Sequence, residues 1–275
     1  MFGEDGRVPA VPRSRLDHLI GNRPLSARSV LASALLGSDA GRLTVAELVG
    51  IASLFGISAG AARTCLWRMV SNGELTGDGG SYSLAGRLSE RRQRVDEASR
   101  IDDATARRWD GTWELAVVAL ERRPAVDRLE LRKAALALHL AELREGVWIR
   151  PNNLDAQRLP ALQAVLDQQC TRFYGATTDI TADKVRVLFS LDEWAADARA
   201  LIEAMDAALT DRDASTESFA YEFALSIAVV RHLQLDPLLP VQLVDDGWPG
   251  GGLRGTYRRF DRAFKQRMNR TFRQS

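Results

Sequence analysis

From Pro24 onward the hydrophobic positions recur at the spacing of amphipathic helices. Ser26 is placed to cap the start of the first helix, and Gly37 is placed to end it. Thr44 and Glu47 have the spacing of a capping box, in which each side chain satisfies a backbone N–H of the other residue. The pattern therefore predicts two short helices in succession, each with one apolar face.

A third helix follows the second after a very short turn. Only Gly56 and Ile57 precede Ser58, which is placed to cap the third helix, and this arrangement is typical of a helix-turn-helix. Beyond it, two short runs flank the glycine-rich turn 77–80 and predict a β-hairpin, the wing. We therefore expect residues 24–86 to form a winged helix-turn-helix domain.

The composition changes at Trp109, where strand-like and helix-like patterns begin to alternate. This alternation predicts an α+β fold for the middle of the chain. A helical region follows, and the run Gly250 to Gly252 is expected to be an irregular connection before a basic helix that begins near Leu253. The predicted strands are 113–120, 147–150, 172–176 and 185–191, and the predicted helices are 129–143, 159–166, 192–209 and 219–235.

A chain of 275 residues is long enough for two or three compact domains. Besides the winged helix, we expect a charged helical linker at residues 87–108, an α+β domain for sensing and dimerisation at 109–212, and a helical C-terminal domain with a basic tail at 213–275. No apolar run is long enough to cross a bilayer, and no signal peptide is recognisable. Cys65 and Cys170 suggest neither a disulfide scaffold nor a zinc site, so we expect a cytoplasmic protein.

The small net charge of +1 hides a strong asymmetry along the chain. Residues 1–108 have a net charge of +3, residues 109–249 a net charge of −9, and residues 250–275 a net charge of +7. An acidic middle is repelled by the phosphate backbone of nucleic acid. Any contact with nucleic acid is therefore expected from the two ends of the chain.

The third helix is the candidate recognition helix for double-stranded DNA. Arg63 is the best candidate for reading a base, because its guanidinium can bond guanine O6 and N7 together, whereas Arg68 is better suited to phosphate. The alternative is an interaction module of this shape that does not bind DNA. Ser26, Arg28 and Thr44 are equally open to two interpretations, phosphate contacts near helix N-termini or local caps. The predicted contact residues are Ser26, Arg28, Thr44, Ser58, Gly60, Arg63, Thr64, Trp67, Arg68 and Tyr82, with Ser71 also on the outer face of the third helix.

Several motifs occur in a characteristic order along the chain: Pro24 to Ser29, Gly41 to Thr44, Gly56-Ile57-Ser58, Ala62-Arg63, Leu66, Arg68-Met69-Val70, Gly73, Leu75, Gly86-Arg87-Leu88, Trp109 to Trp113, Val147 to Pro151, Asp236-Pro237, Leu239-Pro240 and Trp248-Pro249. With these motifs the chain resembles the phenylacetic acid degradation repressors, the PaaX-like family, whose N-terminal domain is similar to GntR-type winged helices. The resemblance implies a homodimeric repressor of a catabolic operon for phenylacetate or a related aromatic acid. It also implies a ferredoxin-like central domain similar to CRISPR spacer-acquisition nucleases, and release by an aryl-CoA thioester such as phenylacetyl-CoA. The alternative within this class is a winged-helix regulator of other metabolism with a different effector or none.

One departure from the GntR-like pattern affects how DNA would be read. Ala59, Gly60 and Ala61 stand where such helices often have Arg and Thr, so few side chains there can bond bases. We therefore expect Arg63, Trp67 and their neighbour Thr64, together with the wing, to discriminate between sequences, with DNA shape contributing.

A nuclease or a CoA-dependent enzyme is the third possibility, and the residues favour it least. A nuclease of that shape needs an acidic residue at the end of its first strand, where Glu121 lies beside two arginines and forms a loop ion pair more readily than a metal site. The chain has none of the common hydrolase, nucleotide-binding or metalloprotease motifs, and His18, His139 and His232 are scattered. We expect no enzyme activity, no cofactor and no metal.

Two further sets of residues have open interpretations. Trp148 and Arg150, with Arg172 and Tyr174, combine cations and aromatic surface that would suit an acyl-CoA effector, or they are simply packed strand ends and surface arginines. In the basic tail, aromatic residues at helical spacing would dock on the body while the arginines face solvent; a phosphate-gripping arm or a clasp on the acidic middle is the alternative. These aromatic residues are Tyr257, Phe260 and Phe264.

Overall fold

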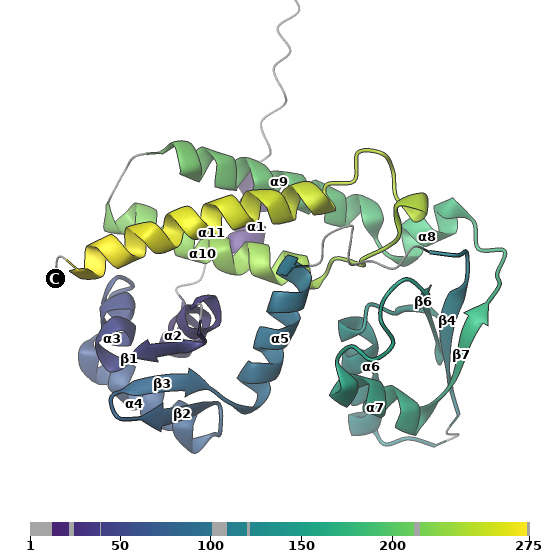
Figure 1. The fold of residues 1–275 in the computed structure, drawn as a ribbon, viewed down its shortest axis with the longest axis horizontal. Coiled ribbons are helices and arrows are strands. Elements are labelled where there is room, and N and C mark those ends of the chain that lie inside the picture. The colour runs from purple at the N-terminus through teal and green to yellow at the C-terminus, as the bar shows by residue number, and fades with distance from the viewer. Residues whose placement is uncertain are drawn as a thin grey trace, which may run out of the picture. The chain divides into compact units, whose positions relative to one another are not determined.

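The protein is an α+β protein with two antiparallel sheets, as the sequence predicts (Figure 1). The computed structural model describes residues 13–21, 25–38, 40–100, 109–119, 122–211 and 215–273. The chain divides into two compact units. The first unit comprises Met1–Glu90, Asp197–Val229 and Thr256–Ser275, and the second comprises Arg91–Ala196 and Val230–Gly255.

The first unit contains the predicted winged helix, and its three helices begin where the caps predict. Ser26, Thr44 and Ser58 each accept a hydrogen bond from the backbone N–H three residues later, and Glu47 completes the capping box with Thr44. Each cap satisfies an otherwise unpaired N–H of the first helical turn, so the helix starts are fixed locally. The helices are α2 (Ala27–Gly37), α3 (Val45–Ser53) and α4 (Ala59–Ser71).

The wing has three strands, one more than predicted. β2 (Leu75–Asp78) and β3 (Ser81–Leu84) form the expected hairpin, and β1 (Arg42–Thr44) adds to the free side of β3. The turn is shorter than predicted, because only Gly79 and Gly80 lie between the strands; both have positive φ, which suits a two-residue hairpin turn. β1 is too short to show an alternating pattern, so the sequence did not indicate it.

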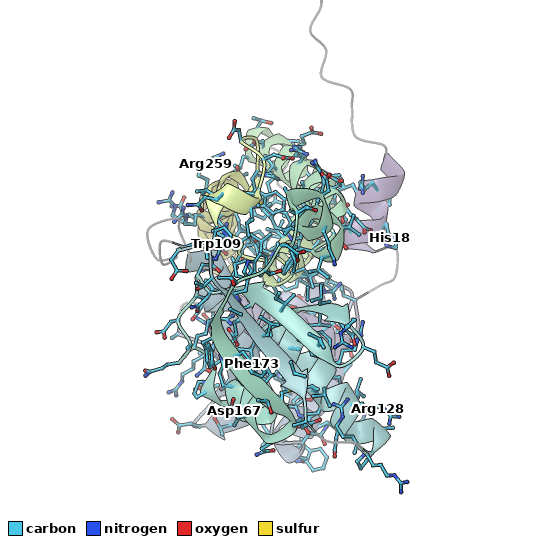
Figure 2. All side chains as sticks on the ribbon, turned by 90° about the vertical axis from the view of Figure 1, so that its right-hand side faces the viewer. His18, Trp109, Arg128, Asp167, Phe173 and Arg259 are labelled. Atoms are coloured by element: carbon cyan, nitrogen blue, oxygen red, sulfur yellow. The ribbon has the colours of Figure 1, made fainter. Side chains whose placement is uncertain are left out.

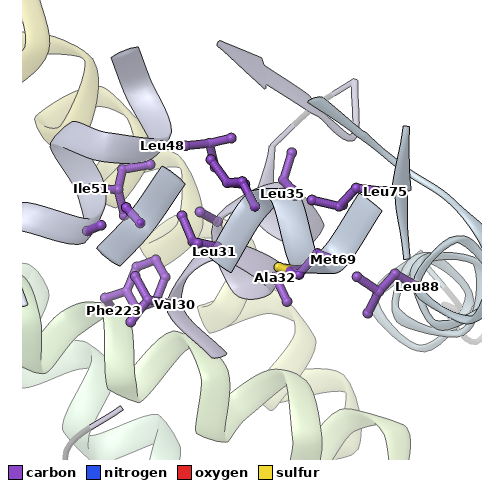
Figure 3. Close-up of a cluster of buried hydrophobic side chains, with 14 of the residues drawn as sticks. Val30, Leu31, Ala32, Leu35, Leu48, Ile51, Met69, Leu75, Leu88 and Phe223 are labelled. Carbon is purple, nitrogen blue, oxygen red and sulfur yellow. The ribbon is translucent and has the colours of Figure 1, made fainter. Parts of the chain in front are cut away.

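The core of the first unit is shared between the winged helix and the C-terminal helices. Leucines of α2, α3 and α4 fill its centre, and Leu88 of α5 (Gly86–Arg100) closes one side (Figure 3). Phe223 of α10 (Thr216–Gln234) packs on Phe55 with 5.0 Å between ring centroids, and Phe264 of α11 (Gly250–Arg273) joins the same cluster. The winged helix therefore buries part of its apolar surface against α10 and α11.

Gly86 starts α5 at a position that requires glycine. Its φ is +48°, and a Cβ there would lie 2.7 Å from the carbonyl oxygen of Gly73. We expect Gly86→Ala to lower the free energy of unfolding by more than about 1 kcal/mol. Gly60→Ala is the matched control, since a Cβ there meets nothing and alanine favours the helix. Thermal unfolding checks both, and equal midpoints for the two variants would contradict the expectation.

The second unit contains the expected ferredoxin-like fold. Its elements follow the order β-α-β-β-α-β, and the sheet order is β5-β6-β4-β7 with all neighbours antiparallel. Alternate side chains of each strand point to opposite faces, and both faces are covered. The elements are β4 (Trp113–Val118), α6 (Ala125–Ala137), β5 (Ala141–Arg144), β6 (Val147–Pro151), α7 (Pro160–Gln169) and β7 (Cys170–Ala176).

Each face of this sheet has its own apolar cluster. On one face Ala116 and Trp148 pack against α6 and α7. On the other face Trp113 and Ile149 pack against α8 (Ala182–Leu188), the start of α9 (Leu191–Thr210) and the segment around the 3-10 helix Val241–Leu243.

Two predictions for the central region were wrong. Residues 185–191 were expected to form a strand, but Thr181 caps the short helix α8 through the N–H of Lys184, and Val185 is buried as part of that helix. The helix predicted over 129–143 ends earlier, because His139 adopts a left-handed φ of 62° and the chain then enters β5. In both places the spacing of the apolar residues fits either a helix or a strand.

The prediction for the glycines at 250–252 was also wrong. They form the first turn of α11 rather than an irregular connection. Gly250 is needed there because a Cβ would lie 2.7 Å from the indole nitrogen of Trp248. The sequence also gave no sign of α1 (Arg13–Ile20), where Arg15 pairs with Asp197 of α9 at 2.6 Å.

A buried ion pair stabilises the C-terminal part of the second unit. Asp236 is 1% exposed and accepts a hydrogen bond from Arg254 at 2.5 Å and from the N–H of Leu238 at 2.9 Å. Burial raises the pKa of the Asp236 carboxyl, and Arg254 opposes this rise. Nearby, Trp194 stacks on both His232 and Trp248.

Candidate nucleic-acid interface

The outer face of α4 has the composition predicted for a recognition helix. Ala62, Leu66 and Met69 are buried in the core, so the opposite side of the helix is presented to solvent. Trp67 is the most conspicuous residue there, with 68% of its surface exposed. The structure brings six predicted residues together on this exposed face: Gly60, Arg63, Thr64, Trp67, Arg68 and Ser71.

The two arginines of this face are available for ligands. Arg63 and Arg68 are exposed, and neither side chain forms a hydrogen bond or an ion pair with any residue that the structure describes. An unpaired guanidinium on a helix surface can bond a base edge or a phosphate without first breaking an intramolecular ion pair. The face therefore offers two cations beside the exposed indole of Trp67.

The predicted phosphate contacts at helix starts are occupied by capping. The Ser26 hydroxyl accepts from the N–H of Ser29, and the Ser58 hydroxyl accepts from the N–H of Ala61. The Thr44 hydroxyl accepts from the N–H of Glu47 and donates to its carboxylate at 2.8 Å. Capping is therefore confirmed for these residues, whereas their contact with phosphate stays a prediction.

Arg28 is held by an acidic partner at the base of the wing. Its guanidinium bonds both carboxylate oxygens of Glu74, with a shortest distance of 2.6 Å, and this hydrogen bonding raises the pKa of Arg28 above its ordinary value. Cys65 of α4 lies beside this pair, and burial raises the pKa of its thiol. The pair connects α2 to the chain entering β2, which makes Arg28 a positioning residue for the wing in this structure.

The tip of the wing has no basic side chain of its own. It consists of Gly77, Asp78, Gly79 and Gly80, and Arg42 of β1 bonds Asp78 at 3.1 Å. The sequence analysis did not single out Arg42, because its pairing with Asp78 depends on how β1 joins the hairpin. Tyr82, predicted as a DNA contact, is half-buried and packs against the core of the winged helix, where its ring lies close to Gly77.

Two of the four predicted effector residues are buried. Trp148 packs in the cluster beneath α6, with the guanidinium of Arg132 5.9 Å from its ring centroid. Arg150 is 2% exposed and donates to the carbonyl of Leu138 at 2.8 Å and to the side chain of Asn153 at 2.9 Å. These donors hold the end of α6 against β6, so Arg150 has an evident structural role.

The other two effector candidates lie together on the edge strand β7. The Arg172 guanidinium lies 5.3 Å from the ring centroid of Tyr174 and forms ion pairs with Glu114 and Asp167. Tyr174 is 54% exposed, whereas Arg172 is largely covered. Glu114 also faces Arg150 across the β4–β6 pair, so one carboxylate stands between the two arginines.

The docking interpretation of the basic tail is confirmed for its aromatic residues. Tyr257, Phe260 and Phe264 are all buried. Arg258 and Arg262 are exposed, and Figure 1 shows α11 on the side of the winged helix away from α4 and the hairpin β2–β3. Glu121, the candidate nuclease carboxylate, lies outside the described residues.

The comparisons with known proteins identify the family. Residues 26–91 match the family model described as PaaX-like protein, and residues 106–186 match the model described as PaaX protein central Cas2-like domain. The chain is similar to a solved structure, the uncharacterized protein Rv0674 from Mycobacterium tuberculosis, with 35% identity and a TM-score of 0.68 over 90% of this chain and 98% of that chain. No curated protein matches the chain. No described helix is long and apolar enough to span a membrane. The chain therefore belongs to the PaaX-like family, a family of regulators of phenylacetate degradation.

Proposed function

We propose that the protein is a DNA-binding transcription regulator that inserts α4 into the major groove of an operator. The observation that carries this proposal is the exposed face of α4, with Arg63 and Arg68 free of acidic partners among the described residues. The major groove is wide enough for a helix, and arginine is the residue that most often reads guanine there. The phosphate contacts come from two sources. These are the backbone N–H groups at the starts of α2, α3 and α4, and the wing.

The protein acts as a homodimeric repressor of an operon for phenylacetate or a related aromatic acid. Its family membership supports this assignment, and two recognition helices on one symmetric operator explain how a short base-reading face reaches useful specificity. In this proposal residues 24–86 read DNA, residues 87–108 link, residues 109–212 sense and dimerise, and residues 213–275 form the helical C-terminal part. The protein acts in the cytoplasm and carries no catalytic activity of its own.

The effector is an aryl-CoA thioester such as phenylacetyl-CoA, bound at the exposed edge of the central sheet. Tyr174 supports this, because a half-exposed aromatic ring above an arginine suits both an aryl group and a phosphate. Arg172 supplies the cation, while Trp148 and Arg150 hold the strands beneath it. The alternative is a regulator of other metabolism that answers to a different thioester or to none.

A gel-shift titration with DNA from the protein's own promoter region, with and without a panel of acyl-CoAs, tests the proposal. Loss of binding with an aryl-CoA thioester alone supports the proposed repressor. Release only by a thioester of another kind, or by none of the panel, supports the alternative regulator. Failure to bind at any salt concentration supports an interaction module, and cleavage of the DNA in Mg²⁺ or Mn²⁺ supports a nuclease.

For the effector site, we expect Tyr174→Ala to bind operator DNA normally but to need at least about tenfold more thioester for release, since it loses an aromatic contact of roughly 1.4 kcal/mol. Phe173→Ala is the matched control, because Phe173, labelled in Figure 2, is exposed to a similar extent and is next in sequence, and successive residues of a strand point to opposite faces of the sheet. Gel-shift midpoints against thioester concentration measure both variants. If both variants change the midpoint equally, Tyr174 is not part of the effector site.

A further inference from the structure

Trp67 is the largest side chain on the exposed face of α4. Ala62, Leu66 and Met69 define the buried side of the helix. At 3.6 residues per turn, Thr64 and Ser71 lie opposite this side, and Trp67 lies between them and Arg63 on the same exposed face. If α4 enters a groove with this face, the indole of Trp67 extends further toward the base edges than the short side chains of Thr64 and Ser71 beside it.

The rest of this face offers few hydrogen bonds for reading an A·T pair. Asn and Gln are the side chains that bond adenine at two positions, and neither occurs on α4. Trp67 is 68% exposed and Val70 is 37% exposed, so the face presents apolar surface instead. In the major groove, the feature of an A·T pair that apolar surface can recognise is the 5-methyl group of thymine.

We propose that Trp67 recognises thymine through its 5-methyl group and thereby sets the A·T preference of each half-site. This inference rests on the proposed DNA-binding function and adds the chemical group that is read. Arg63 and Trp67 are four residues apart, a rise of about 6 Å along the helix, or about two base-pair steps. A guanine read by Arg63 and a thymine read by Trp67 should therefore stand two or three base pairs apart.

Replacing thymine by deoxyuridine tests this directly, because it removes the methyl group and leaves base pairing and hydrogen-bonding groups unchanged. Operator duplexes with a single replacement at each thymine are titrated with the wild-type chain, with Trp67→Ala and with Val187→Ala. Val187 is 79% exposed on α8 and serves as the control for truncating an exposed apolar side chain. Because Trp67 is outside the core, its replacement is expected to leave the thermal unfolding midpoint unchanged.

For the wild type and Val187→Ala, we expect that one or two of the thymine positions in each half-site are sensitive to replacement. A single replacement at such a position should weaken binding about fourfold, which is the effect of losing one buried methyl group. Trp67→Ala should bind thymine and deoxyuridine at those positions with equal affinity. If Trp67→Ala loses as much affinity as the wild type when thymine is replaced by deoxyuridine, the inference is wrong. It is also wrong if no replacement changes the affinity of the wild type for its operator. In both cases the proposed DNA-binding function stands. A wild type with no preference for operator over random DNA overturns the proposed function and the inference together.

Discussion

Replacing Arg63 by alanine is expected to remove the preference of the protein for its operator over random DNA at fixed salt. Arg63 is exposed, flanks the centre of the α4 face, and has no ion pair with the residues that the structure describes. Loss of a bidentate contact to guanine costs about 1–3 kcal/mol, and a dimer loses it in both half-sites. Competition binding against operator and scrambled duplexes of equal length measures the change.

Arg68→Ala is the matched control on the same helix. A phosphate contact carries no sequence information, so we expect this variant to weaken binding to operator and random DNA equally. It should also lower the slope of log affinity against log salt by about 1. If Arg63→Ala keeps the full operator preference, or if Arg68→Ala alone loses it, the assignment of base reading to Arg63 is wrong.

The second large effect is expected from Arg254→Ala, which should destabilise the second unit by about 3–5 kcal/mol. The Arg254 side chain is 8% exposed and bonds Asp236, whose side chain is 1% exposed. Removing the cation leaves a carboxylate buried without its charged partner, which costs far more than the loss of a surface pair. Urea denaturation followed by circular dichroism measures the change.

Arg259→Ala provides the comparison for that experiment. Arg259 also lies on α11 and pairs with Asp206 at 3.2 Å, but both side chains are about half exposed. Surface pairs of this kind contribute about 0–1 kcal/mol, so the variant should unfold close to the wild type. A loss below about 1 kcal/mol for Arg254→Ala would show that the Asp236 carboxylate is not dependent on this partner.

The features that sequence reasoning predicted correctly are those encoded locally. Ser26, Thr44 and Ser58 begin helices because a hydroxyl three residues from a free N–H needs no distant partner. The exposed face of α4 was predictable for the same reason, since helical periodicity separates Leu66 from Arg63. The ferredoxin-like fold of the central domain was implied by the family resemblance, whereas the local pattern missed β5 and predicted a strand in place of α8.

The features that it missed depend on residues far apart in the chain. Phe223 and Phe264 enter the core beside Val30 although about 190 and 230 positions separate them from it, and no local pattern indicates that contact. β1 exists because β3 offers it a free edge, and α8 forms where local periodicity also allowed a strand. Arg150 appeared to be a ligand cation, but its hydrogen bonds to Leu138 and Asn153 depend on tertiary packing.

The most direct test of the account is a titration of the full chain against fluorescent DNA from its own promoter region and against a scrambled duplex of the same length, at one fixed salt concentration. A regulator that reads sequence through α4 should bind the promoter fragment at least about 10³-fold more tightly than the scrambled duplex. Equal affinity for the two duplexes, or no binding to either at low salt, would contradict the account.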